Sequence, residues 1–301
     1  MSVTVRVPAK VNVQLAVGAA RPDGFHDLAN VFLAVGLHDD VTATAADELT
    51  LTCEGPGADQ VPLDRANLAA RAAIALGERY GIEPRVHLHI DKDIPVAGGM
   101  AGGSADAAGA LVACDALWGT GATRDELLDI CAELGSDVPF SLVGGAALGT
   151  GRGEKLQLLD VGGEFWWVFA AADGGLSTPA VYGEFDRLAE TAGRAVPDPE
   201  ASPALLDALR SGDTAALAAT LTNDLQPAAL SLFPALKGTL DAGTAAGALA
   251  GLVSGSGPTT AFLCVDEKSA HTVAAALTAS GTCRSVRVTT SPAPGATVVQ
   301  G

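Results

Sequence analysis

Positive charge is scarce in this sequence. The 301 residues include 18 lysines and arginines against 35 aspartates and glutamates, which gives a formal net charge of −17. Such a balance disfavours nucleic acid and anionic membranes as partners, and neither is expected. Any phosphate group that this chain binds has to be held by local backbone N–H groups and a few well-placed cations, because the overall field opposes it.

Long apolar runs and paired cysteines are also missing. No apolar stretch is long enough to span a bilayer, and residues 1–7 (MSVTVRV) alternate like a strand and lack the pattern of a signal peptide. The number of cysteines is odd, and no two of them have the spacing of zinc ligands. We therefore expect reduced thiols, no metal site built from them, and a cytoplasmic location. The cysteines are Cys53, Cys114, Cys131, Cys264 and Cys283.

Strand and helix patterns alternate along the chain and start again near residue 165. With 48% apolar and 18% charged residues, the composition is that of a globular protein long enough for two cores. We predict an α+β fold of two domains, residues 1–158 and 159–301, with the active site in the cleft between them. Strands are predicted at 3–7, 11–17, 41–45, 85–91, 166–171, 247–254, 259–265 and 285–290, and helices at 67–80, 104–117, 125–134, 179–189, 203–209, 214–221 and 269–279.

Four glycines lie between a predicted strand and a long predicted helix. They allow positive φ and a close approach of a ligand to the backbone. The start of the helix adds free N–H groups and the positive end of the helix dipole. These features predict an anion site suited to the polyphosphate of ATP, where the hydroxyl of Ser104 can bind a phosphate or Mg²⁺. The predicted ATP-binding residues are Pro95, Val96, Ala97, Gly98, Gly99, Met100, Ala101, Gly102, Gly103, Ser104 and Ala105.

Two familiar nucleotide motifs do not fit this segment. Gly98 and Gly103 have the GxxxxG spacing of a P-loop, but Ser104-Ala105 stands where that motif requires Lys-Ser/Thr. Met100 and Ala101 interrupt the G-x-G-x-x-G spacing of dinucleotide-binding folds, which disfavours an oxidoreductase. An ordinary flexible turn is the simpler alternative, and four glycines followed by a serine favour the phosphate site over it.

A second glycine turn lies at residues 255–260 (GSGPTT), between two apolar strands. A tight hairpin explains it by itself. It can equally close over a phosphate or brace the first glycine loop. Neither glycine segment contains G-x-S-x-G, which disfavours a serine hydrolase.

Two charged residues stand in apolar surroundings. Lys10 lies in residues 7–13 (VPAKVNV), and Asp137 lies in residues 134–140 (LGSDVPF). Burying either charge without a partner costs several kcal/mol. A buried Lys–Asp bridge is the structural explanation, and a base with a cation beside a reacting hydroxyl is the functional one. Their occurrence together with the phosphate loop in one chain favours the functional explanation.

These segments together resemble the GHMP kinases. The three signatures are residues 8–12 (PAKVN), 95–108 and 252–259 (LVSGSGPT). Residues 21–26 (RPDGFH), 135–140 (GSDVPF) and 223–227 (NDLQP) are most similar to members that act on a cytidine diphosphate conjugate of methylerythritol. The resemblance covers nearly the whole chain. It implies a ribosomal-S5-like N-terminal domain and a ferredoxin-like C-terminal domain.

The resemblance also implies an activity: ATP, with Mg²⁺, phosphorylates the 2-hydroxyl of the methylerythritol moiety in the non-mevalonate isoprenoid pathway. Asp137 matches the family's catalytic aspartate and Lys10 its partner lysine. Asp106 and Ala105 depart from the family's frequent Asn and Ser, which puts the phosphate and Mg²⁺ contacts there in question. The positions that match those holding the substrate are Asn12, Phe25, His26, Thr178 and Tyr182.

Alternatives stay open at this point. Another GHMP kinase, of the homoserine or mevalonate type, shares the glycine loop, and a catalytically inactive sensor of nucleotide or sugar shares the fold. His26 and Tyr182 can read and stack on a cytosine, or they can be a solvated side chain and the filling of a domain interface. Monomer and homodimer are equally compatible with the sequence.

Overall fold

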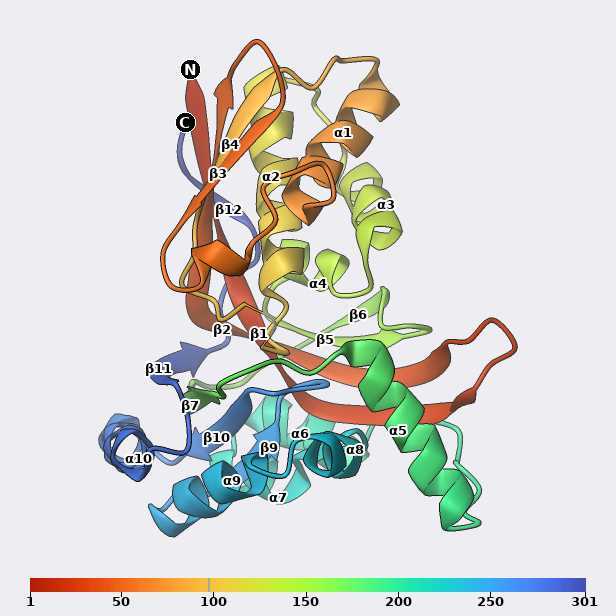
Figure 1. The fold of residues 1–301 in the computed structure, drawn as a ribbon, viewed down its shortest axis with the longest axis vertical. Helices are drawn as coiled ribbons and strands as arrows, with labels where there is room; N and C mark the ends of the chain where they lie inside the picture. The colour runs from red at the N-terminus through yellow and green to blue at the C-terminus, as the bar shows by residue number, and fades with distance from the viewer. Residues whose placement is uncertain (97) are drawn as a thin grey trace.

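A computed structural model describes residues 1–96 and 98–301 of the chain. Ala97, one of the predicted ATP-binding residues, lies outside the described residues. The described parts form two β-sheets, each covered by helices (Figure 1).

The larger sheet contains eight of the described strands, in the order β12–β1–β2–β4–β3. In addition β5 pairs with β2 and β6, and the short β8 pairs with β1. The bounds are Ser2–Ala20 (β1), His26–Ala45 (β2), Thr50–Glu54 (β3), Val86–Asp91 (β4), Ala146–Thr150 (β5), Lys155–Leu159 (β6), Thr222–Asn223 (β8) and Thr297–Gln300 (β12).

Strand β1 is longer than its sequence pattern predicts. The pattern indicates two strands separated near Pro8, whereas the structure has one strand from Ser2 to Ala20. Its pairing with β2 shifts register between Pro8 and Ala9. A proline has no N–H to give to the ladder, and a local irregularity of this kind accommodates it without ending the strand. The prediction of a break was therefore wrong, and the strand carries Lys10 straight past the irregularity.

Helices α1 to α4 lie on one side of the larger sheet (Figure 1). Asn67 caps α1 by accepting the N–H of Ala69, and Thr123 forms a capping box with Glu126 at α3, so both predicted helix starts are confirmed. Alanines of α2 pack closely against the buried valines of β1 in the main core. The bounds are Leu68–Tyr80 (α1), Gly102–Trp118 (α2), Arg124–Leu134 (α3) and Val138–Val143 (α4), and the loop between β3 and α1 contains the 3₁₀ helix Ala58–Gln60 (η1).

The second sheet has the order β11–β7–β10–β9, with all neighbours antiparallel. Its strands and α10 confirm the predicted elements to within a few residues. The strands are Phe165–Ala171 (β7), Ala250–Val253 (β9), Thr260–Cys264 (β10) and Ser285–Ser291 (β11). The helices of this half are Thr178–Thr191 (α5), Pro203–Ser211 (α6), Thr214–Thr220 (α7), Gln226–Leu232 (α8), Leu236–Ala245 (α9) and Glu267–Ser280 (α10).

Two features connect the halves. The far end of the β1–β2 hairpin packs on the second half, where Val17 and Leu28 share a core with Val181 of α5. Strand β12 pairs with β1, so the chain ends beside its own beginning (Figure 1). A division at residues 158 and 159 thus stays a prediction, with residues 297–300 lying in the larger sheet.

No helix among the described residues has the length and apolar character needed to cross a membrane.

Candidate active site

The glycine-rich loop connects the end of β4 to the start of α2, and its backbone is unusual. Gly99 has φ +73°, and Ala101 has φ +63°, the one positive value at a non-glycine position in the described chain. Ala101 is the N-cap of α2, and no side chain caps its N–H groups. Residues 95–105 carry no charged side chain. The first turn of α2 therefore presents free backbone donors, which is the arrangement that binds anions.

The second glycine turn braces this loop. The carbonyl oxygen of Gly99 accepts a hydrogen bond from Ser254 Oγ at 3.0 Å, and the N–H of Thr259 donates to the carbonyl of Gly98 at 3.3 Å. A Cβ atom at Gly99 would lie 2.2 Å from the carbonyl oxygen of Ser254. The turn also closes the antiparallel β9–β10 hairpin, where the N–H of Ser254 donates to the carbonyl of Thr259 at 2.9 Å, so the contacts support both the hairpin and the brace. Only a glycine fits at position 99 without displacing its neighbour.

Lys10 connects this loop to Asp137. Its ammonium donates to the Gly99 carbonyl at 3.0 Å and lies 3.5 Å from Asp137 Oδ2. The lysine side chain is buried, whereas that of Asp137 is 33% exposed. Asp137 stands at the N-terminus of α4. The pair predicted from the sequence is therefore formed, and its carboxylate is partly exposed while its ammonium is buried.

Asn12 supports Lys10 from the same strand. Its Oδ1 accepts the ammonium of Lys10 at 2.7 Å, and its Nδ2 donates to Asn30 Oδ1 at 2.7 Å. All three side chains are buried. Asn30, on β2, is a residue that sequence reasoning missed, because its closeness to Asn12 depends on the register of the β1–β2 hairpin.

His26 and Tyr182, which are 156 positions apart, lie against each other with ring centroids 5.0 Å apart. His26 Nδ1 lies 2.8 Å from the carbonyl of Gly18, which can only accept, so Nδ1 carries a proton. Its Nε2 lies 3.5 Å from Asp186 Oδ2. Burial, with a smaller effect from the charge of Asp137, raises the pKa of Tyr182 well above its usual value. His26 is buried rather than solvated.

The other two predicted substrate-binding residues in this region, Thr178 and Phe25, lie on different elements and have different contacts. Thr178 Oγ1 is 2.9 Å from Ser256 Oγ, which links the start of α5 to the second glycine turn. Phe25 is 49% exposed, and the guanidinium of Arg152 lies over its ring at 5.0 Å. Arg152 was not singled out from the sequence, since only the fold brings the turn between β5 and β6 to the tip of the β1–β2 hairpin.

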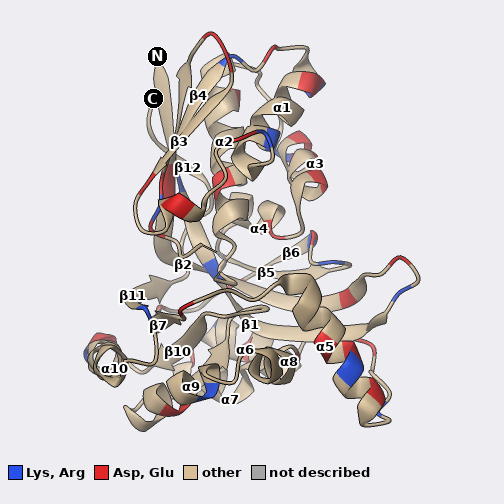
Figure 2. Cartoon of the chain, in the orientation of Figure 1, with Lys and Arg blue, Asp and Glu red and all other residues tan. Residues whose placement is uncertain are grey.

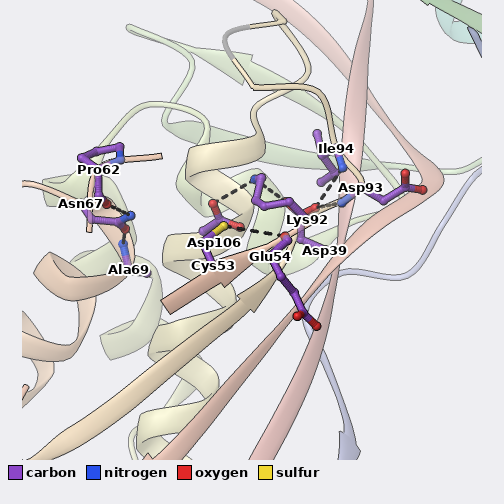
Figure 3. A network of polar contacts seen from close by, with 10 residues as sticks. All are labelled: Asp39, Cys53, Glu54, Pro62, Asn67, Ala69, Lys92, Asp93, Ile94 and Asp106. Carbon is purple, nitrogen blue, oxygen red and sulfur yellow. Dashed lines mark hydrogen bonds and ion pairs between the residues drawn. The ribbon is translucent and has the colours of Figure 1, made fainter. Parts of the chain in front are cut away.

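A buried charged triad lies beneath the glycine loop (Figure 3). The ammonium of Lys92 contacts Asp39 Oδ2 at 2.6 Å and Asp106 Oδ2 at 2.9 Å. Burial raises the pKa of Asp106 to about 7, against the opposing effect of Lys92. The two carboxylates outweigh burial at Lys92 and keep its own pKa raised. Sequence reasoning missed Lys92 and Asp39. The signal available was a lysine directly after an apolar strand in a chain with five lysines.

The charged side chains do not form a positively charged cluster around the glycine loop. Figure 2 shows acidic and basic residues scattered over helices and loops of both halves, with no basic cluster at the start of α2. Attraction for an anion here has to come from the backbone and from Lys10.

Comparison with known proteins identifies the family. The models of the GHMP kinases N terminal domain and of the GHMP kinases C terminal domain match residues 67–145 and 205–283. A Streptomyces avermitilis protein named 4-diphosphocytidyl-2-C-methyl-D-erythritol kinase is 79% identical and covers 99% of this chain and 100% of its own length. The chain belongs to the family of 4-diphosphocytidyl-2-C-methyl-D-erythritol kinases.

Further relatives agree. The Streptomyces coelicolor kinase of the same name is 75% identical over 99% of this chain and 100% of its own. A crystal structure of a 4-(cytidine 5'-diphospho)-2C-methyl-D-erythritol kinase, 32% identical, covers 95% of this chain and 98% of its own with a TM-score of 0.77. Membership in this kinase family confirms the predicted α+β two-domain fold, the kinase class and ATP as phosphoryl donor. These relatives support neither the homoserine or mevalonate kinase alternative nor the inactive sensor.

Proposed function

We propose that the protein transfers the γ-phosphoryl group of ATP to the 2-hydroxyl of 4-diphosphocytidyl-2-C-methyl-D-erythritol, with Asp137 and Lys10 as the catalytic residues. One observation carries the assignment of roles: the ammonium of Lys10 contacts both the Gly99 carbonyl and, at 3.5 Å, the carboxylate of Asp137. The side chain of Lys10 thereby connects the glycine loop to Asp137, the candidate base. The names of the relatives support the acceptor.

The reaction needs positioning and charge neutralisation more than covalent chemistry by the protein. The acceptor oxygen forms a bond to the γ-phosphorus while the bond to the β–γ bridging oxygen breaks, and ADP leaves. Asp137, partly exposed, takes the hydroxyl proton. Lys10, 3.5 Å from that carboxylate, offsets the negative charge that develops nearby.

The phosphates of ATP are proposed to lie on the N–H groups of residues 95–105 and the first turn of α2. Mg²⁺, when bound, would neutralise phosphate oxygens, and the Ser104 hydroxyl in that turn is the group we assign beside it. Asp106 does not fit as a ligand, because it is buried and bonded to Lys92. The acid gained at position 106 therefore need not weaken phosphate binding.

The cytosine of the acceptor is proposed to stack on Tyr182 and to meet His26, whose rings already face each other. Phe25 and Thr178 border the same region from the hairpin tip and from α5. Asn12 already bonds Lys10 and Asn30, so its remaining amide hydrogen is the group left for the acceptor. The cytoplasmic location and the choice between monomer and homodimer stay predictions.

A coupled ADP-release assay tests this proposal. The panel contains 4-diphosphocytidyl-2-C-methyl-D-erythritol, mevalonate, homoserine and galactose, each with ATP and Mg²⁺. We expect turnover with the first compound alone. Turnover with another member of the panel at a comparable kcat/KM would refute the acceptor assignment and leave the kinase assignment intact.

A further inference from the structure

The buried triad joins the two ends of the glycine loop. Lys92 directly follows β4, on one side of the loop, and Asp106 lies in the second turn of α2, on the other side. Their side chains meet at 2.9 Å. Asp39, on β2, holds Lys92 with Oδ2 and accepts the N–H groups of Asp93 and Ile94 with Oδ1, at 2.8 and 2.9 Å. Figure 3 shows these contacts converging beneath the loop.

Gly102, the first residue of α2, lies close to Lys92 of this triad. A Cβ atom at Gly102 would lie 3.1 Å from Lys92 Nζ and 3.3 Å from Ile94 Cγ2. Lys92 thus lies close beside the point where α2 begins, and it is only 2% exposed. With both neighbouring carboxylates bound to it, its ammonium is not placed to bind a phosphate itself.

Stability alone does not account for three buried charges. A buried ion pair or triad can often be replaced by apolar side chains of similar volume at no loss of stability, because desolvation offsets the attraction. Apolar side chains, however, cannot hold the N–H groups of Asp93 and Ile94 in place. What the triad supplies is a fixed geometry at both ends of the loop.

We propose that Lys92, Asp39 and Asp106 are positioning residues for the phosphate loop, which set the direction of its N–H groups and of the first turn of α2 toward one anion. This inference rests on the proposed function, since it assumes that the loop binds the phosphates of ATP. It assigns the triad no contact with either substrate. Its effect is confined to the nucleotide, because the triad touches the loop from below and the acceptor region involves other elements.

The experiment compares Asp39→Asn with Asp40→Asn in the full chain. The two carboxylate oxygens of Asp39 accept hydrogen bonds from Lys92 and from the N–H groups of Asp93 and Ile94. An asparagine at position 39 has only one side-chain oxygen to accept them. Asp40 is the next residue on β2 and only pairs with Arg6 on the surface, so its loss should be neutral. We expect Asp39→Asn to raise the KM for ATP about 10-fold or more, the scale of one hydrogen bond to a charged group. The KM for the acceptor should stay within about twofold.

A second pair of variants keeps the test decisive if Asp39→Asn does not fold. Asp106→Leu removes the tie to α2 and leaves Lys92 and Asp39 as a neutral pair, and it should also weaken ATP about 10-fold. Asp106→Asn should restore most of the affinity, because its amide oxygen still accepts from Lys92. A folded Asp39→Asn or Asp106→Leu with wild-type KM for ATP, or an equal rise in both KM values, would overturn the inference.

Failure of the proposed function has a different signature. Calorimetric titration with a non-hydrolysable ATP analogue is carried out on the wild type, on both triad variants and on Gly99→Ala, which distorts the loop directly. If Gly99→Ala binds the analogue like the wild type, the nucleotide lies elsewhere and the phosphate site of the proposed function fails. If Gly99→Ala loses affinity while both triad variants keep it, only the inference about the triad fails.

Discussion

Replacing Gly99 by alanine tests the phosphate loop most sharply, because the structure fixes both parts of the cost. The first part is conformational: φ at position 99 is +73°, a region that costs an L-residue about 1–2 kcal/mol. The second part is steric: the new Cβ would lie 2.2 Å from the Ser254 carbonyl oxygen and has to move to at least 3.0 Å. That shift separates the loop from its brace.

Gly119→Ala is the matched control. Gly119 is the C-cap of the same helix α2, with φ +65° and nothing within 4 Å of its Cβ position, so it carries the conformational cost without the clash. Each variant should lose about 1–2 kcal/mol of stability from φ alone. Only Gly99→Ala should also misplace the loop by close to 1 Å, a displacement that can cost about 10²-fold in rate.

The assay is ADP release with varied ATP at saturating acceptor, with the melting temperature of each variant measured by calorimetry. We expect kcat/KM for ATP to fall roughly 10- to 100-fold in Gly99→Ala and to be nearly unchanged in Gly119→Ala. If the two variants lose equal stability and have the same ATP kinetics, the loop geometry is not what binds the nucleotide.

Four further predictions concern single side chains. Asp137→Asn should keep the fold and the affinity for ATP analogues but lower kcat about 10²-fold or more, and a folded variant with normal turnover would remove Asp137 from the mechanism. Lys10→Met should fold and lose turnover; a lower melting temperature with activity preserved would instead make Lys10 a structural partner of Asp137. Tyr182→Ala should raise the acceptor KM about 10-fold with ATP binding kept, and an unchanged acceptor KM with lower stability would favour a packing role. Because the pKa of Asp106 is raised to about 7, the folded state binds its proton more tightly than the unfolded state, so stability should fall as pH rises from about 4 to 7. Denaturant titrations across that range should show this slope in the wild type and a smaller slope in Asp106→Asn.

Sequence reasoning was most successful where a short segment carries its own physical signature. The glycine loop, the cap at Thr123 and the strand predicted at 85–91 follow from composition and spacing within about ten residues, and the structure has all three, with the strand at Val86–Asp91. The pairing of Lys10 with Asp137 required more, because it rested on the improbability of two unpaired charges in apolar surroundings. That argument holds at any sequence distance, and the two groups lie 3.5 Å apart.

The first part of β2 shows where such reasoning fails. Residues 28–35 (LANVFLAV) are buried on both faces, so the alternation that marks a half-exposed strand is absent. The second half of the chain covers the outer face of this strand, and a single-sequence pattern cannot include that contact. Asn30 was overlooked for the same reason, and with it the hydrogen-bond chain to Asn12 and Lys10.

Asp106 shows a second limit of sequence reasoning. The gain of an acid at this position was recognised, but where its side chain points was not. From the sequence it is an acid gained beside a predicted phosphate site, which puts the phosphate and Mg²⁺ contacts there in question. In the structure it points into the core, where Lys92 takes up its charge, and Asp39 reaches the same ammonium from 53 positions earlier in the chain. Neither periodicity nor local motif connects those positions, since only the stacking of α2 on β2 and β4 brings them together.

These observations explain how a chain with a net charge of −17 can bind a polyanion. The loop has no charged side chain, so the phosphate site that we propose there has to rely on oriented N–H groups, whose effect is local and does not depend on the sum of distant charges. Of the two lysines next to the loop, Lys10 contacts the Gly99 carbonyl and Asp137, whereas Lys92 contacts the two carboxylates of Asp39 and Asp106. Since backbone donors act only when they point the right way, such a site depends on rigidity at both ends of the loop. The brace from Ser254 and Thr259 on one side and the triad on the other are placed to provide that rigidity.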